Sequence, residues 1–488
     1  MPATTNSVLK PFLKSTAVYS VSIVASKMAG FVLLPLYTRY LTTTDYGVLE
    51  LMELTLFVVS TLFGMRLGDG LMYYYAKAET PRDSASVVTS SLLGGLALGA
   101  AGALLGYLAA PLVSMLVFNS AQYTGFFRLI FCNFALALPV EVGFCYIRAL
   151  DRSVVYMVAS LAQLGLSIAA NVFVLTSLHA GISGLLWAKL ATSTLMLAGT
   201  LIYGFSQIRF SWHLKTFVLL VRYSAPLGIG GLGFLIIHYG DRFVLQHYVS
   251  LAQVGIYALA YKLGMLVSYF GMPFELYWSA QKFNLVRGAD GDKLFVRVCT
   301  YQALCLGFVV VGLSLFSEPM LHVMVAPAYW PAAQYVPWIA FAYWIRMIGS
   351  HFRNVFFLQA ETQRDAAVIW SSALVCIVAY ALLIPRYKLW GAVTATCGAF
   401  GVMLVIALWQ ANRVRRFQYE YTRLAGVCFA IVGTVALYSI SRPHAVWSQV
   451  GYAACLCLLY PMIVLVPQFL RKDEVLFLRR IASELGWH

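Results

Sequence analysis

Charged residues are scarce in this chain, and acidic residues are scarcer than basic ones. Only 11% of the 488 residues are charged, whereas 61% are hydrophobic and the mean hydropathy is +0.78. This composition excludes an ordinary soluble globular protein. The 34 basic and 19 acidic residues give a formal net charge of +15. No basic stripe stands apart from the hydrophobic segments, so the charge does not indicate a nucleic-acid-binding protein.

Motifs of enzymes, redox sites and metal sites are lacking as well. The nine cysteines are an odd number, and all of them fall inside hydrophobic segments without a CxxC pair, which favours a packing role. The sequence has no Walker glycine-rich loop, no GxSxG motif and no nucleotide fingerprint. We therefore expect no metal, no cofactor and no ATP hydrolysis by the chain itself.

Long hydrophobic runs are abundant. A membrane span needs roughly 20 mostly apolar residues, and in lipid a helix satisfies its own backbone polar groups. The sequence predicts an all-α polytopic membrane protein with about fourteen transmembrane helices. The segments lie near 15–37, 46–65, 86–117, 123–147, 154–177, 182–205, 217–238, 250–274, 295–316, 334–357, 367–385, 389–410, 424–441 and 446–468.

Lysine and arginine are distributed unevenly between alternate loops. If the N-terminus lies inside, the inner side holds 23 of them and the outer side five. Because short cytoplasmic loops carry the positive excess, we expect both termini in the cytoplasm. The loops at 39–45, 239–249 and 386–388 are then expected outside. Lys27 interrupts the first apolar stretch and further spans follow at once, so we expect no cleaved signal peptide.

Two stretches of the chain resemble each other at a fixed shift of 208 positions. Residues 35–118 lie on residues 243–326 without a gap, and the shift places Tyr40 on Tyr248, Gly47 on Gly255 and Leu51 on Leu259. The shift spans six predicted helices, so the two copies run parallel in the membrane. The sequence thus predicts two six-helix lobes, 1–209 and 210–412, and a final part, 413–488, with two added helices and a cytoplasmic tail.

Short motifs in both predicted lobes resemble a known family. These are LTTTDYGVL (41–49), Asp241-Arg242, Val254-Gly255-x-Tyr257, Tyr261-Lys262-Leu263 and APAYWPAA (326–333). They resemble polysaccharide and O-antigen flippases of the multidrug/oligosaccharidyl-lipid/polysaccharide exporter superfamily. The resemblance covers most of residues 10–410. It implies fourteen helices, a cavity between two lobes that opens alternately to each side, and a lipid-diphosphate-linked oligosaccharide as cargo.

One stretch departs from the family pattern. After the second span, such proteins often carry an arginine before paired tyrosines, but this chain has Leu71-Met72-Tyr73-Tyr74-Tyr75. The cytoplasmic contact of the cargo is therefore not assigned to this stretch.

Ionisable residues at membrane depth are functional candidates, because they are costly unless they face a cavity or a partner. Basic side chains suit a diphosphate cargo, and carboxylates suit a proton or Na⁺. The substrate-binding candidates are Lys27, Lys262, Arg346 and Arg353. The ion-coupling candidates are Glu53, Glu50 and Glu141.

Several of these residues have simpler interpretations. Lys189 can pair with Glu141 as a contact between helices, and Arg353 fits an interfacial position near a span end. Asp241-Arg242 fits a structural turn in an outer loop. The aromatic residues Tyr329, Trp330, Trp338, Tyr343 and Trp344 fit either sugar stacking or the usual interfacial belts. Gly228, Gly230, Gly231 and Gly233 favour a helix that bends.

The sequence favours a flippase for a polyprenyl-diphosphate-linked oligosaccharide in a bacterial cytoplasmic membrane, coupled to an ion gradient. The repeat unit of an O-antigen, capsule or exopolysaccharide fits this description. Expected partners are the lipid-linked substrate, membrane lipids and a glycan polymerase or other assembly protein. One alternative is a cation-coupled exporter of drugs or other small molecules from the same superfamily, which would be expected to have an acidic cavity. Another is a membrane glycan polymerase or glycosyltransferase, which would need a long catalytic loop.

Overall fold

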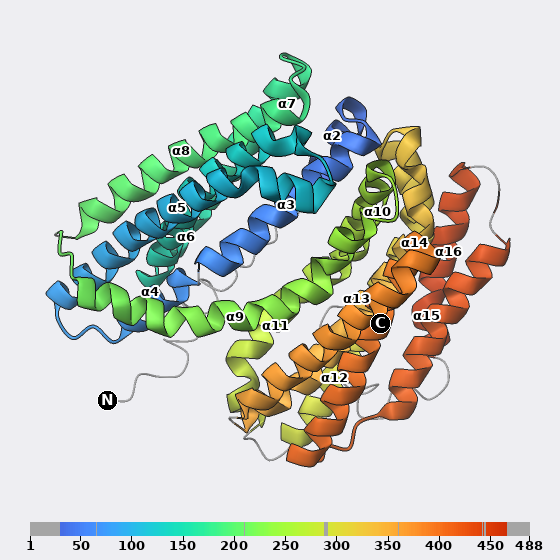
Figure 1. Ribbon diagram of the computed structural model, residues 1–488. Coiled ribbons are helices and arrows are strands. Elements are labelled where there is room, and N and C mark those ends of the chain that lie inside the picture. The colour runs from blue at the N-terminus through green and yellow to red at the C-terminus, as the bar shows by residue number, and fades with distance from the viewer. Residues whose placement is uncertain are drawn as a thin grey trace, which may run out of the picture. The chain divides into compact units, whose positions relative to one another are not determined.

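A computed structural model describes residues 30–465 of the chain, apart from 65, 209, 287–290, 360, 442 and 444–445. Within these residues every element is a helix, so the prediction of an all-α protein is confirmed (Figure 1). The elements are α2 (Leu34–Tyr40), α3 (Thr43–Gly64), α4 (Leu67–Ala76), α5 (Pro81–Phe118), η1 (Ala121–Tyr123), α6 (Thr124–Ala149), α7 (Ser153–Thr176), α8 (Gly181–Gln207), α9 (Leu214–Leu245), α10 (Leu251–Gly264), α11 (Leu266–Val286), α12 (Gly291–Met324), η2 (Pro327–Gln334), α13 (Val336–Leu358), α14 (Thr362–Val414), α15 (Tyr421–Ser441) and α16 (Val446–Leu465).

The helices follow the hydrophobic segments closely. From the second segment onward the predicted spans follow the helices, except that the segment 250–274 is divided between α10 and α11 and the segments 367–385 and 389–410 fall together in α14. Lys388 divides α14, because its φ of 52° and ψ of −124° are not helical. Most of the first predicted span lies outside the described residues. In the described part, nine helices are long and apolar enough to cross a membrane, or ten if bent α9 counts as one span. The chain is therefore a multi-pass membrane protein.

Helix α9 bends where glycines gather. Its two halves, Leu214–Gly228 and Gly230–Leu245, meet at an angle of 40°. Pro226 precedes the bend, and four glycines lie between 228 and 233. Proline removes a backbone hydrogen bond and glycine removes side-chain support, and both effects allow a helix to bend. The bend that the glycines favour is found at this position.

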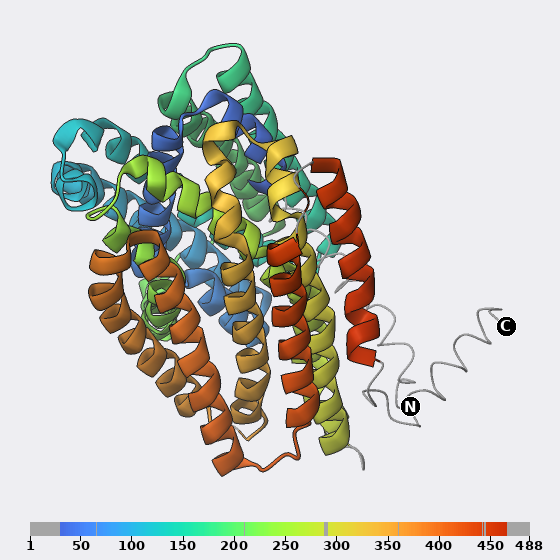
Figure 2. The ribbon, with the colours of Figure 1, turned by 90° about the vertical axis from the view of Figure 1, so that its right-hand side faces the viewer.

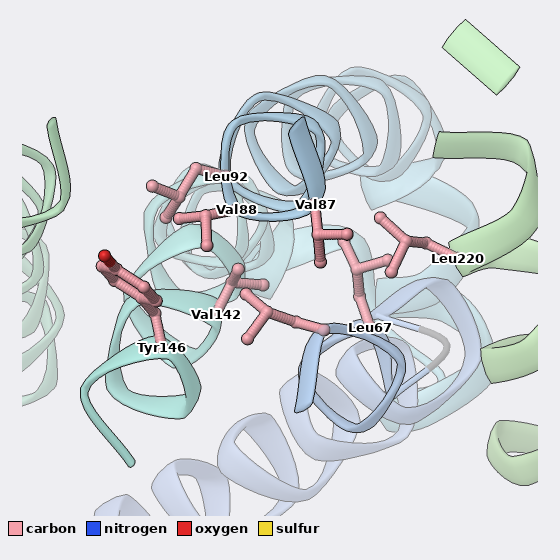
Figure 3. Packing of buried hydrophobic residues seen from close by; sticks show 8 residues of the cluster. Leu67, Val87, Val88, Leu92, Val142, Tyr146 and Leu220 are labelled. Atoms are coloured by element: carbon pink, nitrogen blue, oxygen red, sulfur yellow. The ribbon is translucent and has the colours of Figure 1, made fainter. Parts of the chain in front are cut away.

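A short helix that the sequence did not predict, α4, lies between α3 and α5. Its Leu67 and Leu71 are completely buried and belong to a cluster with Val88 of α5, Val142 of α6 and Leu220 of α9 (Figure 3). Close van der Waals packing stabilises such contacts between the helices of a membrane protein. The stretch after the second span is therefore part of the packed protein and not a free inner loop.

Two predicted outer loops are shorter than expected. The loop at 39–45 is reduced to residues 41–42 between α2 and α3. Helix α9 continues through residues 239–245, so only residues 246–250 connect α9 to α10. The prediction of a loop over 239–245 is wrong, because the opposite charges of Asp241 and Arg242 pair and can remain inside a buried helix.

The chain divides into two compact units. Unit 1 comprises Met1–Leu259, Met324–Pro331 and Gln363–Met403, and unit 2 comprises Ala260–Val323, Ala332–Thr362 and Leu404–His488. In unit 1, α6 packs against both α5 and α8 (Figure 1). In unit 2, α11 packs on α13, and α15 lies beside α16 (Figure 2). The lobe boundaries at 209 and 412 stay predictions.

Candidate functional site

The first group of candidate residues is an ion pair between α3 and α8 in unit 1. The ammonium of Lys189 lies 3.4 Å from Oε1 of Glu53. Glu53 lies in the middle of α3, and both side chains keep close to half of their surface exposed, 46% for Glu53 and 40% for Lys189. The prediction that Lys189 pairs with Glu141 is wrong, because Lys189 is directed to α3. Glu141 lies on an exposed face of α6.

The Glu53–Lys189 pair lines a small pocket. The pocket is shallow and open to its surroundings, and Asn133 of α6 also lines it. The Asn133 side chain accepts a hydrogen bond from Ser193 of α8 at 3.0 Å, which fixes its orientation. The remaining lining residues are apolar: Met52, Leu56, Ile130 and Leu186. An acid, a base and an amide thus share one small space among three helices.

The second group is a buried ionic cluster in the same unit. Nη1 of Arg242 donates a hydrogen bond to Oδ1 of Asp241 at 2.9 Å, and Nε of Arg242 lies 3.6 Å from Oε1 of Glu50. The Tyr257 hydroxyl donates to Oδ2 of Asp241 at 2.5 Å. Arg242 also donates to the backbone carbonyl of His238 at 3.1 Å. The cluster joins α3, α9 and α10, and its charged side chains are at most 6% exposed.

This cluster corrects the interpretation of Asp241-Arg242 as a turn in an outer loop. Both residues are helical and almost fully buried. Burial of a charge is tolerated only when it is paired and hydrogen-bonded. Glu50 and Tyr257 supply these partners from two other helices. Tyr257 was not predicted as a site residue, although it belongs to the same sequence motif as Gly255.

The third group consists of basic side chains in unit 2. Lys262 is half-buried on α10, and Arg346 is half-buried on α13, where its Nη2 donates to the hydroxyl of Ser268 at 3.1 Å. The rings of Tyr261 and Tyr343 meet edge to face at 5.6 Å. Because these tyrosines lie next to Lys262 and one turn before Arg346, the two basic residues lie on contacting helices. Helix α13 also carries Arg353, half-buried and two turns beyond Arg346.

One buried basic residue of unit 2, Lys282, was not among the candidates predicted from the sequence. The sequence assigned Lys282 to an inner loop, but it is 6% exposed on α11. Its ammonium donates to the Asn354 side chain of α13 at 2.7 Å and lies 4.6 Å from the ring centroid of Phe357. A lysine separated from an apolar segment by a few residues looks like a loop residue, and only the packing of α11 on α13 shows its burial. Lys27 lies outside the described residues.

The sequence matches the protein family described as "Polysaccharide biosynthesis protein" over residues 12–274, more than half of the chain. The chain belongs to this family. The resemblance drawn from its short motifs is therefore confirmed. No curated protein matched the chain.

Several solved structures share the fold of this chain at low sequence identity. A lipid II flippase, MurJ, in an inward closed conformation aligns with a TM-score of 0.70 at 13% identity and covers 92% of this chain and 98% of that chain. An inward-facing multidrug resistance MATE family transporter of the MOP superfamily aligns with a TM-score of 0.65 at 14% identity. The alignment covers 82% of this chain and 95% of that chain. A MOP superfamily transporter from Pyrococcus furiosus aligns with a TM-score of 0.55 at 15% identity. The alignment covers 82% of this chain and 97% of that chain. The chain therefore has the fold of these flippases and transporters.

The aromatic candidates differ in how far they are buried. Tyr329, Tyr343 and Trp344 are at most 4% exposed. Tyr329 donates to the carbonyl of Leu41 at 3.1 Å and Trp344 donates to the carbonyl of Ala303 at 2.9 Å. These three side chains have packing roles and present no face to a sugar. Trp338 is 54% exposed.

The three groups of candidate residues consist of charged side chains. In the part of the chain that the structure describes, no group of three or more histidine, cysteine or carboxylate side chains could hold a metal ion. Unit 1 provides carboxylates that are already paired with Lys189 and Arg242. Unit 2 provides ammonium and guanidinium groups on α10, α11 and α13. The described residues thus include groups that can bind an anionic headgroup and groups that can exchange a proton or a small cation.

Proposed function

We propose that this protein is an alternating-access flippase that moves a polyprenyl-diphosphate-linked oligosaccharide across the bacterial cytoplasmic membrane. The family match over residues 12–274 carries the proposal, because it links the chain to polysaccharide biosynthesis. The fold that it shares with a lipid II flippase over 92% of its length supports movement of a lipid-linked cargo. Both termini lie in the cytoplasm in this proposal, following the distribution of lysine and arginine.

The diphosphate is held by basic side chains. Moving it unpaired into a low-dielectric cleft would cost many kcal/mol, so several cationic donors must surround it. Lys262 and Arg346 lie on contacting helices and have half-buried side chains. Lys27 and Arg353 complete the proposed set. Arginine binds a phosphate with a planar fork, whereas lysine acts as a point charge.

An ion gradient drives the transport. Glu53 is the leading coupling carboxylate, because it lies at mid-helix, keeps close to half of its surface exposed and lies 3.4 Å from Lys189. A proton or Na⁺ that neutralises Glu53 removes its attraction for Lys189, and this changes the contact between α3 and α8. Glu50 and Glu141 are the further proposed coupling carboxylates.

Depletion of the protein in cells that produce a surface glycan tests the proposal. We expect the lipid-linked repeat unit to accumulate on the cytoplasmic side and the surface glycan to disappear, and the wild-type gene to restore it. Unchanged surface glycan would contradict the proposal. Altered resistance to cationic dyes without a glycan defect would favour the drug exporter. Export of single repeat units without chain growth would favour the glycan polymerase.

A further inference from the structure

Helices α3 and α10 begin at equivalent positions of the two sequence repeats. Helix α3 begins at Thr43 and α10 at Leu251, which are 208 positions apart. A capping box precedes each helix: the Asp45 amide donates to the Thr42 hydroxyl at 3.1 Å, and the Gln253 amide donates to the Ser250 hydroxyl at 3.3 Å. In return, the Asp45 side chain accepts a hydrogen bond from the Thr42 amide, and the Gln253 side chain accepts one from the Ser250 amide. The shift of 208 also relates the two capping boxes, so the repeat is present in local structure.

The two helices cross at the equivalent glycines, Gly47 and Gly255. A Cβ atom on Gly47 would lie 2.1 Å from the carbonyl oxygen of Leu251, and one on Gly255 would lie 2.2 Å from the carbonyl oxygen of Thr43. The two contacts are reciprocal, as a local twofold axis between the repeats requires. Such an approach of two backbones is open only to glycine. Thr43, Gly47, Leu251 and Gly255 are called the glycine crossing below.

The buried ionic cluster lies directly beyond the glycine crossing. Glu50 follows Gly47 by three residues on α3, and Tyr257 follows Gly255 by two residues on α10. The contact between Glu50 and Arg242 therefore links α3 of the first predicted lobe with α9 of the second. The glycine crossing and this ion pair connect the same two lobes at the same end of α3.

We propose that the glycine crossing and the Glu50–Arg242 pair form a closure that holds the two lobes together at the Thr43/Leu251 end and separates in every transport cycle. Glu50 and Arg242 are then positioning residues for transport. This inference rests on the proposed flippase function, because a carrier that opens alternately to each side must close one end while the other is open. It gives Glu50 a part in closure in addition to its proposed part in ion coupling.

The ion pair that links the two predicted lobes is the longer of the two ion pairs of Arg242. The Glu50–Arg242 distance is 3.6 Å, whereas Arg242 and Asp241 are 2.9 Å apart and belong to one helix. When α3 withdraws, Arg242 keeps Asp241, and Asp241 keeps the Tyr257 hydroxyl. No cationic charge is left buried alone. At Gly47 and Gly255 the nearest atoms of the opposite helix are backbone atoms.

Cysteine crosslinking in membranes tests whether the closure opens. Thr43 and Leu251 are partly exposed at their helix starts, so Thr43→Cys and Leu251→Cys together present two reactive thiols. A short cleavable bis-maleimide should link them, stop glycan export and allow export again after cleavage. Each single variant treated in the same way is the control. Full export by the linked protein would overturn the proposal, because the closure would then be static. Failure of two individually reactive thiols to link would also overturn it, because the contact would be absent.

A methyl group at the crossing tests the contact itself. Gly47→Ala should reduce both the rate of crosslinking and glycan export, because the added methyl forces α3 away from Leu251. Gly165→Ala on α7 is the matched control, since a Cβ there meets no atom within 4 Å. Crosslinking and export by Gly47→Ala at the wild-type rates would overturn the proposal. If the wild-type protein supports no glycan export, the proposed function fails, whereas crosslinking still reports whether the closure exists.

Discussion

The ammonium of Lys189 lies 3.4 Å from the carboxylate of Glu53, although the two residues are 136 positions apart in the sequence. The pair joins α8 to α3 at the edge of a pocket that Asn133 also lines. At membrane depth each of these charges is costly without a partner, so a proton or a small cation must neutralise Glu53 before the pair can separate. That property suits a group that exchanges a partner during transport.

Replacing Glu53 should affect the coupling of transport to the ion gradient and leave folding of the protein unchanged. Glu53→Gln removes the titratable carboxylate and the attraction for Lys189, so transport should lose its dependence on the ion gradient while the protein level stays near normal. Transport into vesicles with and without a pH or Na⁺ gradient measures this. Glu79→Gln, at an exposed residue between α4 and α5, is the control and should behave as the wild type. Equal behaviour of the two variants would remove Glu53 from the coupling site.

Substitutions of Arg346 should show whether the planar guanidinium group binds the headgroup. Arg346→Lys keeps the charge but loses the planar fork, so part of the glycan export should remain, whereas Arg346→Ala should leave little. Export at equal protein level in membranes checks both variants. Arg128→Ala is the control, because Arg128 is an exposed basic residue on α6 that lies against the Tyr107 ring. If all three variants exported glycan equally, Arg346 would have no part in substrate binding.

Lys27 and Lys262 should matter through their charge. Alanine at either position should severely reduce glycan export, and glutamate should abolish it, because a negative charge repels the diphosphate. All four variants should still insert into the membrane, as fractionation and blotting would show. Intact export by the double variant Lys27→Ala and Lys262→Ala at normal protein level would contradict binding of the anionic headgroup by these residues.

Arg242 should be the most costly of the charged residues to remove. Arg242→Ala leaves Glu50 and Asp241 buried without their guanidinium partner, and breaking such a pair costs about 3–5 kcal/mol. The midpoint of unfolding of the detergent-solubilised protein should therefore fall markedly, and Arg242→Lys should recover part of the loss. Arg128→Ala should change stability by no more than about 0.5 kcal/mol. Equal midpoints for the two alanine variants would show that the buried cluster does not stabilise the fold.

The sequence was sufficient for the features that depend on local pattern. Apolar length predicts the long helices, and the repeat predicts that Gly47 and Gly255 are equivalent. It could not predict α4, because the run LGDGLMYYYA is short and carries glycines and a charge. Burial of this run depends on a cluster that four helices assemble.

Pairing between distant charges could not be predicted either. The sequence shows Asp241 and Arg242 beside each other, and adjacent opposite charges are typical of a solvated turn. Only the arrival of Glu50 from α3 and Tyr257 from α10 makes their burial tolerable. In the same way, the sequence indicates Glu141 as the partner of Lys189, and only the packing of α3 against α8 brings Glu53 to it.

The central claim is that this protein moves a lipid-linked oligosaccharide across a membrane. Reconstituted vesicles that contain the purified protein and the lipid-linked oligosaccharide of its source cells test the claim most directly. A membrane-impermeant oxidant added outside should reach only the outer half of the substrate in empty vesicles. With the wild-type protein and an ion gradient it should reach nearly all of it, and Arg346→Ala should abolish this gain. Equal protection of the substrate in vesicles with and without the protein would contradict the account.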